Sequence, residues 1–284
     1  MSDNPLANVG DLAKPFDTLV KKIAKGVGTL YEPRRIRNVA EAEAEASKIK
    51  AESEIEITDL HRRAEQRRIE EEAKHQKNME DITAKAAPHL NEDANPDAMD
   101  DDWVANLFDK CRIVSDEEMQ SLWARVLATE ANTPGTLSKR TVNLLSDFDK
   151  SDADLFTKLC GFGWVIGVIP VIPLVFDVQA DIYIRNGINL DTLNHLDTIG
   201  LIQFSGIQSF GQTGLPKRFA VSYYGKLLSL EMPQDPNNQL ITGKVVLTKI
   251  GQELAPICGS KPVEGFYEYV KEQWKEYLPA AEKD

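Results

Sequence analysis

The chain has 284 residues, of which 42% are hydrophobic and 27% are charged, and its formal net charge is −12 at pH 7. This composition is ordinary for a globular protein and allows one substantial core or two small ones. The negative charge argues against general affinity for nucleic acid, because phosphate binding needs a local excess of Lys and Arg. Cys111, Cys160 and Cys258 form no C-x-x-C pair, so we expect buried thiols in a reducing compartment.

The first residues and the longest apolar stretch give no signal for export or membrane insertion. The first residues carry two acids and no basic stretch ahead of an apolar block, unlike a secretory signal. The longest apolar stretch, residues 161–176, is shorter than the roughly 20 residues that a membrane-spanning helix needs, and Pro170 and Pro173 interrupt it. We therefore expect a cytoplasmic protein in which this stretch is buried core.

Residues 1–32 have the pattern of an amphipathic helix. Apolar side chains recur at spacings of three and four, which places them on one helical face. They are Leu6, Val9, Leu12, Phe16, Leu19, Val20, Ile23, Val27 and Leu30, and the lysines among them are Lys14, Lys21, Lys22 and Lys25. Such a helix would suit a membrane interface, with its lysines near anionic headgroups. The alternative is that it packs on its own protein or on a neighbouring subunit.

Residues 33–88 predict one long charged helix. Strong helix formers dominate this range, which contains no glycine and no proline between Pro33 and Pro88. At 1.5 Å rise per residue, about fifty residues would extend roughly 75 Å, so the helix would project from a compact domain. Its apolar residues are sparse and hold no heptad register, so we expect identical neighbours to pack beside it, for example in a closed ring. The alternative is a solvated spacer.

A linker and a helical body follow the long helix. Residues 89–102 are acidic and rich in Asn, Pro and Asp, which predicts a linker. Residues 103–187 predict a helical body in which Ser115 caps one helix, with Glu118 completing a capping box. The last helix of this body is expected to extend to Trp164.

Residues 188–284 change to a mixed pattern. A helix ending at Gly200 precedes a short strand, and two β-rich runs, residues 218–232 and 238–248, predict a hairpin joined by the turn between them. Thr248 is expected to cap the next helix. Helix, strand and hairpin in this order are the parts of a winged-helix-like module. The expected fold class is thus mainly α with a small α+β part: a long projecting N-terminal helix, a helical body and a winged-helix-like C-terminal module with a final helix.

The sequence carries none of the common catalytic signatures. It has no phosphate loop, dinucleotide fingerprint, zinc-protease helix or nucleophile elbow. The four histidines, His61, His75, His89 and His195, are scattered, with no cysteines beside them at metal-ligand spacing. We expect no catalytic residue, no metal site and no cofactor.

A winged-helix-like module raises the possibility of nucleic-acid binding, which charge can test. Residues 188–260 contain as many acidic as basic residues, and the helix LDTLNHLDTIG has two aspartates and no Lys or Arg. Such a helix would repel phosphates in a major groove. Lys217 and Arg218, in the expected wing, are the residues that would contact nucleic acid, but we prefer protein interaction or subunit packing.

Three segments carry a resemblance to a known family: YEPRRIRNVAEAEAEASKIKAESEIEITDLHRRA, VSDEEMQSLWARVLATEANTPGTLSKRTVNLL and LTKIGQELAPICGSKPV. Over nearly its whole length the chain resembles the uncharacterised bacterial family called domain of unknown function 2806. That family has no established activity, so the resemblance implies no catalytic residues. The C-terminal two thirds, through EEMQSLWARVLA, LDTIGLI and LTKIGQEL, are also similar to Abi-alpha proteins, which are associated with abortive infection by phage. The AEAEAEASKIKAESE run is similar to the long helices of stomatin-type ring-forming membrane proteins.

We therefore expect a non-enzymatic bacterial protein, cytoplasmic or peripheral at the inner membrane, whose main partner is itself. The long helix would join subunits into a ring or cone, and many weak N-terminal helices would together bind an anionic membrane surface through avidity. The Abi-alpha similarity implies a setting in phage defence and a phage-derived trigger. The alternative function is nucleic-acid binding or regulation through the winged-helix-like module.

Overall fold

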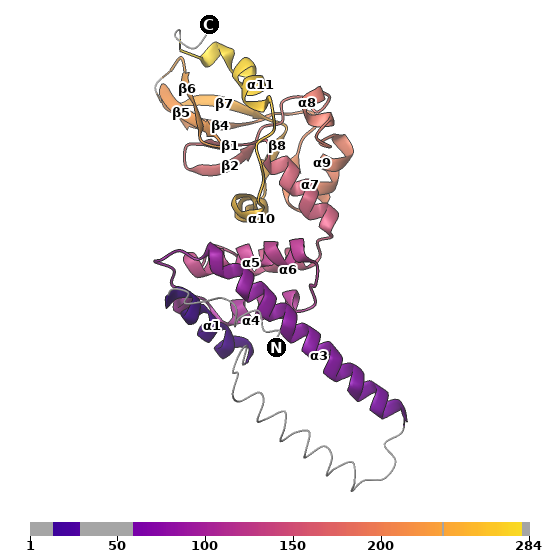
Figure 1. Ribbon diagram of the computed structural model, residues 1–284. Helices are drawn as coiled ribbons and strands as arrows, with labels where there is room; N and C mark the ends of the chain where they lie inside the picture. Colours follow the sequence, from indigo (N-terminus) through magenta and orange to yellow (C-terminus); the bar gives the residue numbers. More distant parts are fainter. Residues whose placement is uncertain (1–13, 29–58, 235, 280–284) are drawn as a thin grey trace. The chain divides into compact units, whose positions relative to one another are not determined.

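The computed structural model describes residues 14–28, 59–234 and 236–279 (Figure 1). The chain divides into two compact units, unit 1 at Met1–Ser146 and unit 2 at Asp147–Asp284. The described part of unit 1 is helical, and unit 2 combines helices with small antiparallel sheets, so the fold is mainly α with a smaller α+β part. The division falls before the boundary expected between residues 187 and 188, because the strand that begins at Gly163 pairs with a strand of the C-terminal part.

Unit 1 is built from helices that pack in pairs. Helix α3 lies on α5, and α4 contacts both α1 and α6. Its core contains the buried rings of Trp103, Phe108 and Trp123. The helices are α1 (Lys14–Val27), α3 (Asp59–Ala86), α4 (Asp101–Cys111), α5 (Glu117–Asn132) and α6 (Lys139–Ser146), with short 3-10 turns at Ala87–His89 and Pro96–Ala98.

The acidic stretch expected as a linker, residues 89–102, lies inside unit 1. The Asn95 backbone N–H donates to the Ala131 carbonyl at 2.9 Å, and the Asn132 side chain donates to the His89 carbonyl at 2.9 Å. Both bonds tie the stretch to the end of α5. The stretch also contains Asp100, whose side chain caps α4 by accepting from the Trp103 N–H at 2.7 Å.

Ser115 was expected to cap α5, but Asp116 does so. The Asp116 carboxylate accepts from the backbone N–H groups of Glu118 and Met119, at 3.0 Å each. Aspartate is as good an N-cap as serine, and a carboxylate at a helix start also interacts favourably with the helix dipole. The helix therefore begins one residue later than the capping-box pattern indicated.

The second half of α3, from His75 to Ala86, is anchored on α5 through a face that mixes apolar and polar side chains. Ile82 and Ala86 are fully buried, and the Asn78 amide donates to the Arg112 carbonyl at 2.8 Å. Glu80 is also buried; its carboxylate accepts from the Gln76 amide at 2.7 Å, and burial raises its pKa. The helix is thus held firmly at this end.

The described residues of unit 2 form three separate antiparallel sheets. Four strands run in the order β2-β1-β5-β6, while β3 pairs with β8 and β4 pairs with β7. The strands are β1 (Gly163–Ile166), β2 (Ile169–Pro173), β3 (Ile202–Phe204), β4 (Phe210–Leu215), β5 (Arg218–Tyr223), β6 (Lys226–Glu231), β7 (Asn238–Gly243) and β8 (Val245–Leu247). The helices are α7 (Lys150–Cys160), α8 (Asp181–Ile184), α9 (Leu190–Thr198), α10 (Lys249–Leu254) and α11 (Phe266–Gln273), with 3-10 turns at Ala255–Ile257 and Lys275–Tyr277.

Trp164 lies in a strand and not, as expected, in the preceding helix. Helix α7 ends at Cys160, and β1 places Trp164 and Ile166 on its buried side with Val165 on the exposed side. This alternation has the period of a strand. Short apolar runs do not distinguish a buried helix from a buried strand by periodicity alone, which explains the error.

The expected hairpin between residues 218–232 and 238–248 is also wrong. The first run is itself a hairpin, because β5 pairs with β6 through the two-residue turn Tyr224-Gly225. Both turn residues have positive φ, 46° at Tyr224 and 86° at Gly225, as a type I′ turn requires. Strand β7 pairs instead with β4, far earlier in the chain.

Two helix boundaries in unit 2 were predicted correctly. Gly200, with φ of 82°, ends α9 in a Schellman motif in which the Leu201 N–H reaches the Leu196 carbonyl at 3.0 Å. Thr248 caps α10 by accepting from the Gly251 N–H at 3.1 Å. The end of α9 and the start of α10 are in contact, because the Thr248 hydroxyl donates to the Gly200 carbonyl at 2.7 Å. The described residues do not show a winged-helix arrangement. A helix across all of residues 33–88 is not shown either, since residues 33–58 lie outside the described residues.

Replacing Gly251 by alanine should destabilise unit 2. A Cβ there would lie 2.1 Å from the Leu201 carbonyl oxygen, which belongs to the backbone of the adjacent segment. The clash should outweigh the gain of roughly 1 kcal/mol in helix propensity and lower the free energy of unfolding by roughly 2 kcal/mol in urea titrations. Gly206→Ala is the control, since a Cβ there meets no atom within 4 Å. Equal stability of the two variants would contradict this packing.

Replacing Glu80 by glutamine should stabilise unit 1 in a pH-dependent way. Because burial raises the pKa of Glu80 above its ordinary 4.5, its deprotonation costs the folded state more than the unfolded state. The wild type should therefore lose stability relative to Glu80→Gln as the pH rises above 4.5, and the two should converge below it. Urea unfolding at about pH 4 and about pH 7.5 measures the difference. If the difference in free energy of unfolding between the two proteins does not grow with pH, burial of the Glu80 carboxylate does not destabilise the folded state.

Candidate functional site

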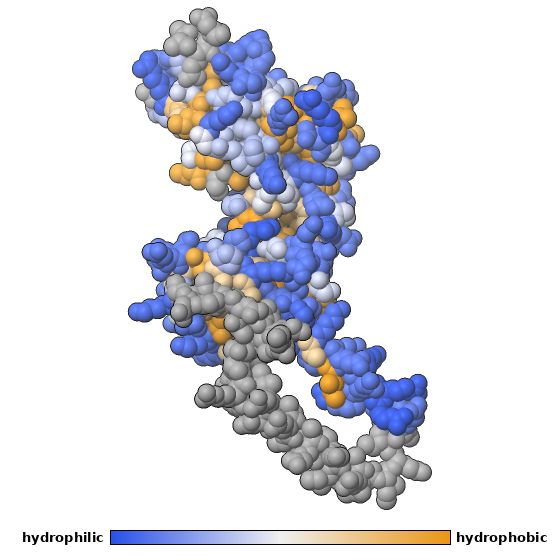
Figure 2. Space-filling model, in the orientation of Figure 1, coloured by the Kyte–Doolittle hydropathy of each residue, from blue (hydrophilic) through white to orange (hydrophobic). Residues whose placement is uncertain are grey.

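The first half of α3 is exposed on every side. Each residue of Asp59–Lys74, which we call the exposed segment, is solvent-accessible in the structure, including Leu60 at 66% and Ile69 at 58%. The surface of α3 is mostly hydrophilic in the space-filling view (Figure 2). This segment is the described part of the long charged helix that the sequence predicted.

Charges within the exposed segment pair along the helix. The Glu65 carboxylate accepts two hydrogen bonds from Arg68, at 2.6 and 2.9 Å, and Arg67 lies 3.6 Å from Glu71. Asp59 pairs with both Arg62 and Arg63. Exposed pairs of this kind contribute a few tenths of a kcal/mol each. They support a helix without giving it a hydrophobic face.

The amphipathic helix α1 packs on unit 1. Phe16, Leu19 and Ile23 are buried, and α1 contacts α4. Lys22 is 8% exposed, pairs with Asp101 at 2.5 Å and donates to the Asp97 carbonyl. In the structure these side chains are buried against their own protein, and membrane contact through them stays a prediction. Leu6, Val9, Leu12 and Leu30 lie outside the described residues.

The remaining lysines of α1 differ in their surroundings. Lys25 lies 3.3 Å from Asp101, whose pKa is lowered by its hydrogen bonds from Lys22 and then Lys25. Lys14 and Lys21 are exposed, and Val20 and Val27 are half-buried. Among the described residues, no helix is both long enough and apolar enough to cross a membrane.

The two residues expected to contact nucleic acid lie at the start of β5. Arg218 is paired with Glu231 on the neighbouring strand β6, through hydrogen bonds of 3.1 and 2.9 Å to one carboxylate oxygen. This contact neutralises the arginine charge. Lys217 is exposed, and its carbonyl accepts from the Met232 N–H at 2.7 Å. The structure therefore pairs Arg218 with an acid on the neighbouring strand.

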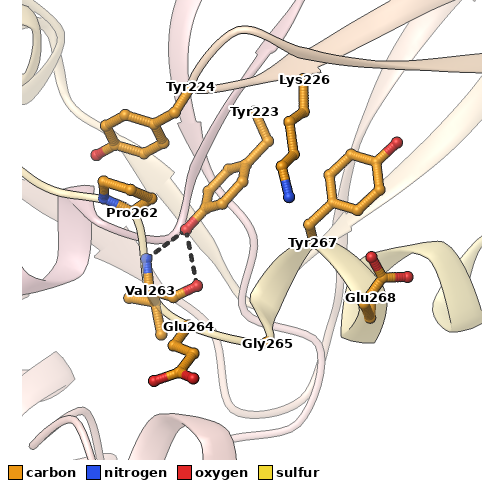
Figure 3. Close-up of a pocket in the computed structure, with 9 residues that line it drawn as sticks. All are labelled: Tyr223, Tyr224, Lys226, Pro262, Val263, Glu264, Gly265, Tyr267 and Glu268. Atoms are coloured by element: carbon orange, nitrogen blue, oxygen red, sulfur yellow. Dashed lines mark hydrogen bonds between the residues drawn. The ribbon is translucent and has the colours of Figure 1, made fainter.

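Unit 2 contains a cavity of about 410 Å³ between the β5–β6 turn and the start of α11, which we call the tyrosine pocket (Figure 3). Three tyrosines from two elements supply its aromatic surface. Its lining residues are Tyr223, Tyr224, Lys226, Pro262, Val263, Glu264, Gly265, Tyr267 and Glu268. Sequence reasoning missed this site, because its two parts lie about forty residues apart and match no known motif.

The tyrosine hydroxyls of the pocket are bound to the protein. The Tyr223 hydroxyl donates to the Gly161 carbonyl at 2.8 Å and accepts from the Val263 N–H at 2.6 Å. The Tyr267 hydroxyl donates to the Leu227 carbonyl at 2.8 Å, and that of Tyr224 lies 2.7 Å from the Ser260 hydroxyl. Burial raises the pKa of Tyr223 to about 12, so this hydroxyl stays protonated near neutral pH. The three tyrosines of the pocket thus offer ring faces, and their hydroxyls are already engaged with the protein.

A buried indole lies behind two of these rings. Trp164 is stacked on Tyr223 with ring centroids 5.2 Å apart and on Tyr267 with centroids 5.5 Å apart. The Trp164 side chain has no solvent exposure. Because one rigid ring supports both tyrosines, their positions are fixed together.

The described residues offer no metal site, since they contain no group of three or more His, Cys, Asp or Glu placed to hold an ion. His195 lies 2.6 Å from Asp152, but Asp152 also accepts from the Asp149 N–H at the start of α7. This contact therefore ties α9 to α7 and has a structural role. The three cysteines are buried free thiols, as expected.

One comparison with known proteins gives a match. A family model described as "Protein of unknown function (DUF2806)" matches residues 62–271, which include part of the exposed segment and the whole tyrosine pocket. No curated protein and no solved structure matches the chain. The expected similarity to Abi-alpha proteins finds no support. Because the family model covers well over half of the sequence, the chain belongs to the DUF2806 family.

Proposed function

We propose that the protein is a non-enzymatic homo-oligomer whose subunits contact one another through the exposed segment of α3. The single observation that supports this is the contrast along one helix. From His75 onward α3 is anchored on α5, whereas Asp59–Lys74 contacts no described residue closely enough to be buried. A helix of this composition is stabilised chiefly by packing, so a partner along the exposed segment would supply the packing that this part of the helix lacks within its own subunit.

The charge distribution of the exposed segment suits a second copy of the same helix. Basic residues gather in its first part, at residues 62–68, and acidic residues at residues 70–72. Over Asp59–Lys74 there are five basic side chains and five acidic ones, so the segment is neutral. Two copies running antiparallel place the basic part of each beside the acidic part of the other. Parallel copies in register would instead place like charges together.

Leu60 and Ile69 would be the apolar contacts of this interface. Isolated exposed apolar residues are common on protein surfaces and carry little weight alone. On a helix with no other large apolar side chain between residues 59 and 74, they are the positions where burial by a neighbour would contribute most. Antiparallel pairing of identical helices is an isologous contact, which closes on itself as a two-fold pair, and a larger ring or cone stays a prediction.

Membrane contact and phage defence stay predictions. The buried placement of Phe16, Leu19 and Ile23 means that lipid binding through these residues would require α1 to leave unit 1. Nucleic-acid binding likewise stays a prediction, and the Arg218–Glu231 pair gives it no support.

Replacing both Leu60 and Ile69 by glutamate should reduce the mass of the oligomer. The substitutions would remove both apolar contacts and place charged side chains where the neighbour is expected to bury apolar ones, so the dissociation constant of the oligomer should rise at least tenfold, which corresponds to about 1.4 kcal/mol. Sedimentation velocity of the full-length protein measures the change.

Ile207→Glu is the matched control, because Ile207 is 92% exposed in unit 2 and outside the proposed interface. It should leave the sedimentation coefficient unchanged. If the double variant sediments like the wild type, or if Ile207→Glu dissociates the protein equally, the exposed segment is not the interface.

A further inference from the structure

We propose that the tyrosine pocket of unit 2 binds an organic cation, the ammonium or guanidinium group of a lysine- or arginine-like ligand. The proposal is independent of the assembly through α3, because it rests on residues of unit 2 alone. Four features of the pocket support it: the ring faces, the side chain that already lies there, the charge of its rim and its rigidity.

The pocket presents aromatic faces and keeps its hydroxyls occupied. Hydroxyls that already donate to the Gly161 carbonyl, the Leu227 carbonyl and the Ser260 hydroxyl have no proton left to donate to a ligand. What the tyrosines still offer is the π-face, which carries partial negative charge and attracts cations. Aromatic surfaces of this kind bind ammonium groups in other proteins.

Lys226 shows where a cation lies in this pocket. Its ammonium nitrogen is 5.3 Å from the centroid of the Tyr267 ring, within the range of a cation–π contact. In Figure 3 its side chain descends between Tyr223 and Tyr267 into the cavity. Among the described residues, no ion pair joins Lys226 to the pocket's own carboxylates. A flexible lysine held only by a ring face can swing into solvent, and a ligand cation would then take its place.

The rim of the pocket favours positive charge. Its lining has two carboxylates, Glu264 and Glu268, against one ammonium, Lys226, and both glutamates are exposed beside the cavity (Figure 3). The chain as a whole carries −12, so its long-range field also attracts cations.

The pocket is rigid and of suitable size. Trp164 stacks on both Tyr223 and Tyr267, with interplanar angles of 24° and 16°, so the two rings need no ordering when a ligand enters. The cavity of about 410 Å³ falls within the range of small-ligand pockets, which is roughly 300–1,000 Å³. It can therefore hold one long basic side chain or a small free amine.

Isothermal titration of the full-length protein with an acetylated, amidated Gly-Arg-Gly peptide tests the proposal. The matched neutral probe is the same peptide with citrulline, which has the shape of arginine without its charge. The arginine peptide should bind and the citrulline peptide should bind at least about fivefold more weakly, as loss of a cation–π contact of about 1 kcal/mol implies. Equal binding of the two, or binding of neither, would overturn the proposal.

Three variants distinguish the pocket from any other acidic surface. Lys226→Met removes the internal competitor and should tighten the arginine peptide about fivefold, whereas Glu268→Gln should weaken it severalfold. Glu272→Gln is the control, since Glu272 lies on α11 outside the lining and pairs with Lys275. If Lys226→Met weakens binding, or if Glu272→Gln acts like Glu268→Gln, the proposed site is wrong.

Tetramethylammonium distinguishes the two sources of the cation. Binding of this ion as tightly as the arginine peptide would identify a free small cation as the ligand. Tighter binding of the peptide would identify a basic side chain of a partner protein. Inorganic phosphate that binds wild type but not Lys226→Met, with no response to the arginine peptide, would show an anion site and overturn the proposal.

Discussion

Most helices in water are stabilised by burying one face, and α3 meets this requirement over only part of its length. Its second half buries Ile82 and Ala86 and satisfies Asn78 through the Arg112 carbonyl. These contacts fix the direction in which the first half of the helix continues. The exposed segment therefore continues, as one helix, the part of α3 that is fixed on α5. An interface built on it would need little ordering of backbone, which lowers the entropic cost of association.

In unit 2, one buried side chain, Trp164, holds other side chains in place in a comparable way. The indole of Trp164 supports two tyrosines, one from β5 and one from α11, that are far apart in the sequence. The pairing of β1 with β5 brings these residues together, since Val165 lies opposite Ser222 beside Tyr223. The tyrosine pocket is thus a consequence of the sheet order β2-β1-β5-β6, and its chemistry follows from ring faces whose hydroxyls are already bonded.

Local chemistry in the sequence predicted some elements well. Gly200 and Thr248 mark helix ends because a positive φ and a hydroxyl cap depend only on neighbouring residues. The long charged helix was likewise indicated by composition over its described part, Asp59–Ala86. The amphipathic pattern of α1 was recognised, but whether its apolar face meets lipid or protein depends on contacts with α4 that no local pattern encodes.

The strand pairing could not be predicted in the same way. Tyr224 adopts a φ of 46°, which tyrosine rarely does, so the Tyr-Gly turn is a weaker hairpin signal than Asn-Gly. Pairing of β4 with β7 and of β1 with β5 joins strands that have other strands and helices between them in the sequence, and such register is decided by tertiary packing. The pocket escaped prediction for this reason, because its residues acquire a common function only when β5 and α11 meet.

Assembly of the protein from copies of itself can be tested by measuring its molar mass. Multi-angle light scattering of the full-length wild type over a concentration series gives this mass without reference to shape. Assembly through the exposed segment predicts a discrete species whose mass is at least twice that of the 31.7 kDa subunit. A mass of 31.7 kDa throughout the micromolar range would contradict it and leave α3 as a solvated spacer.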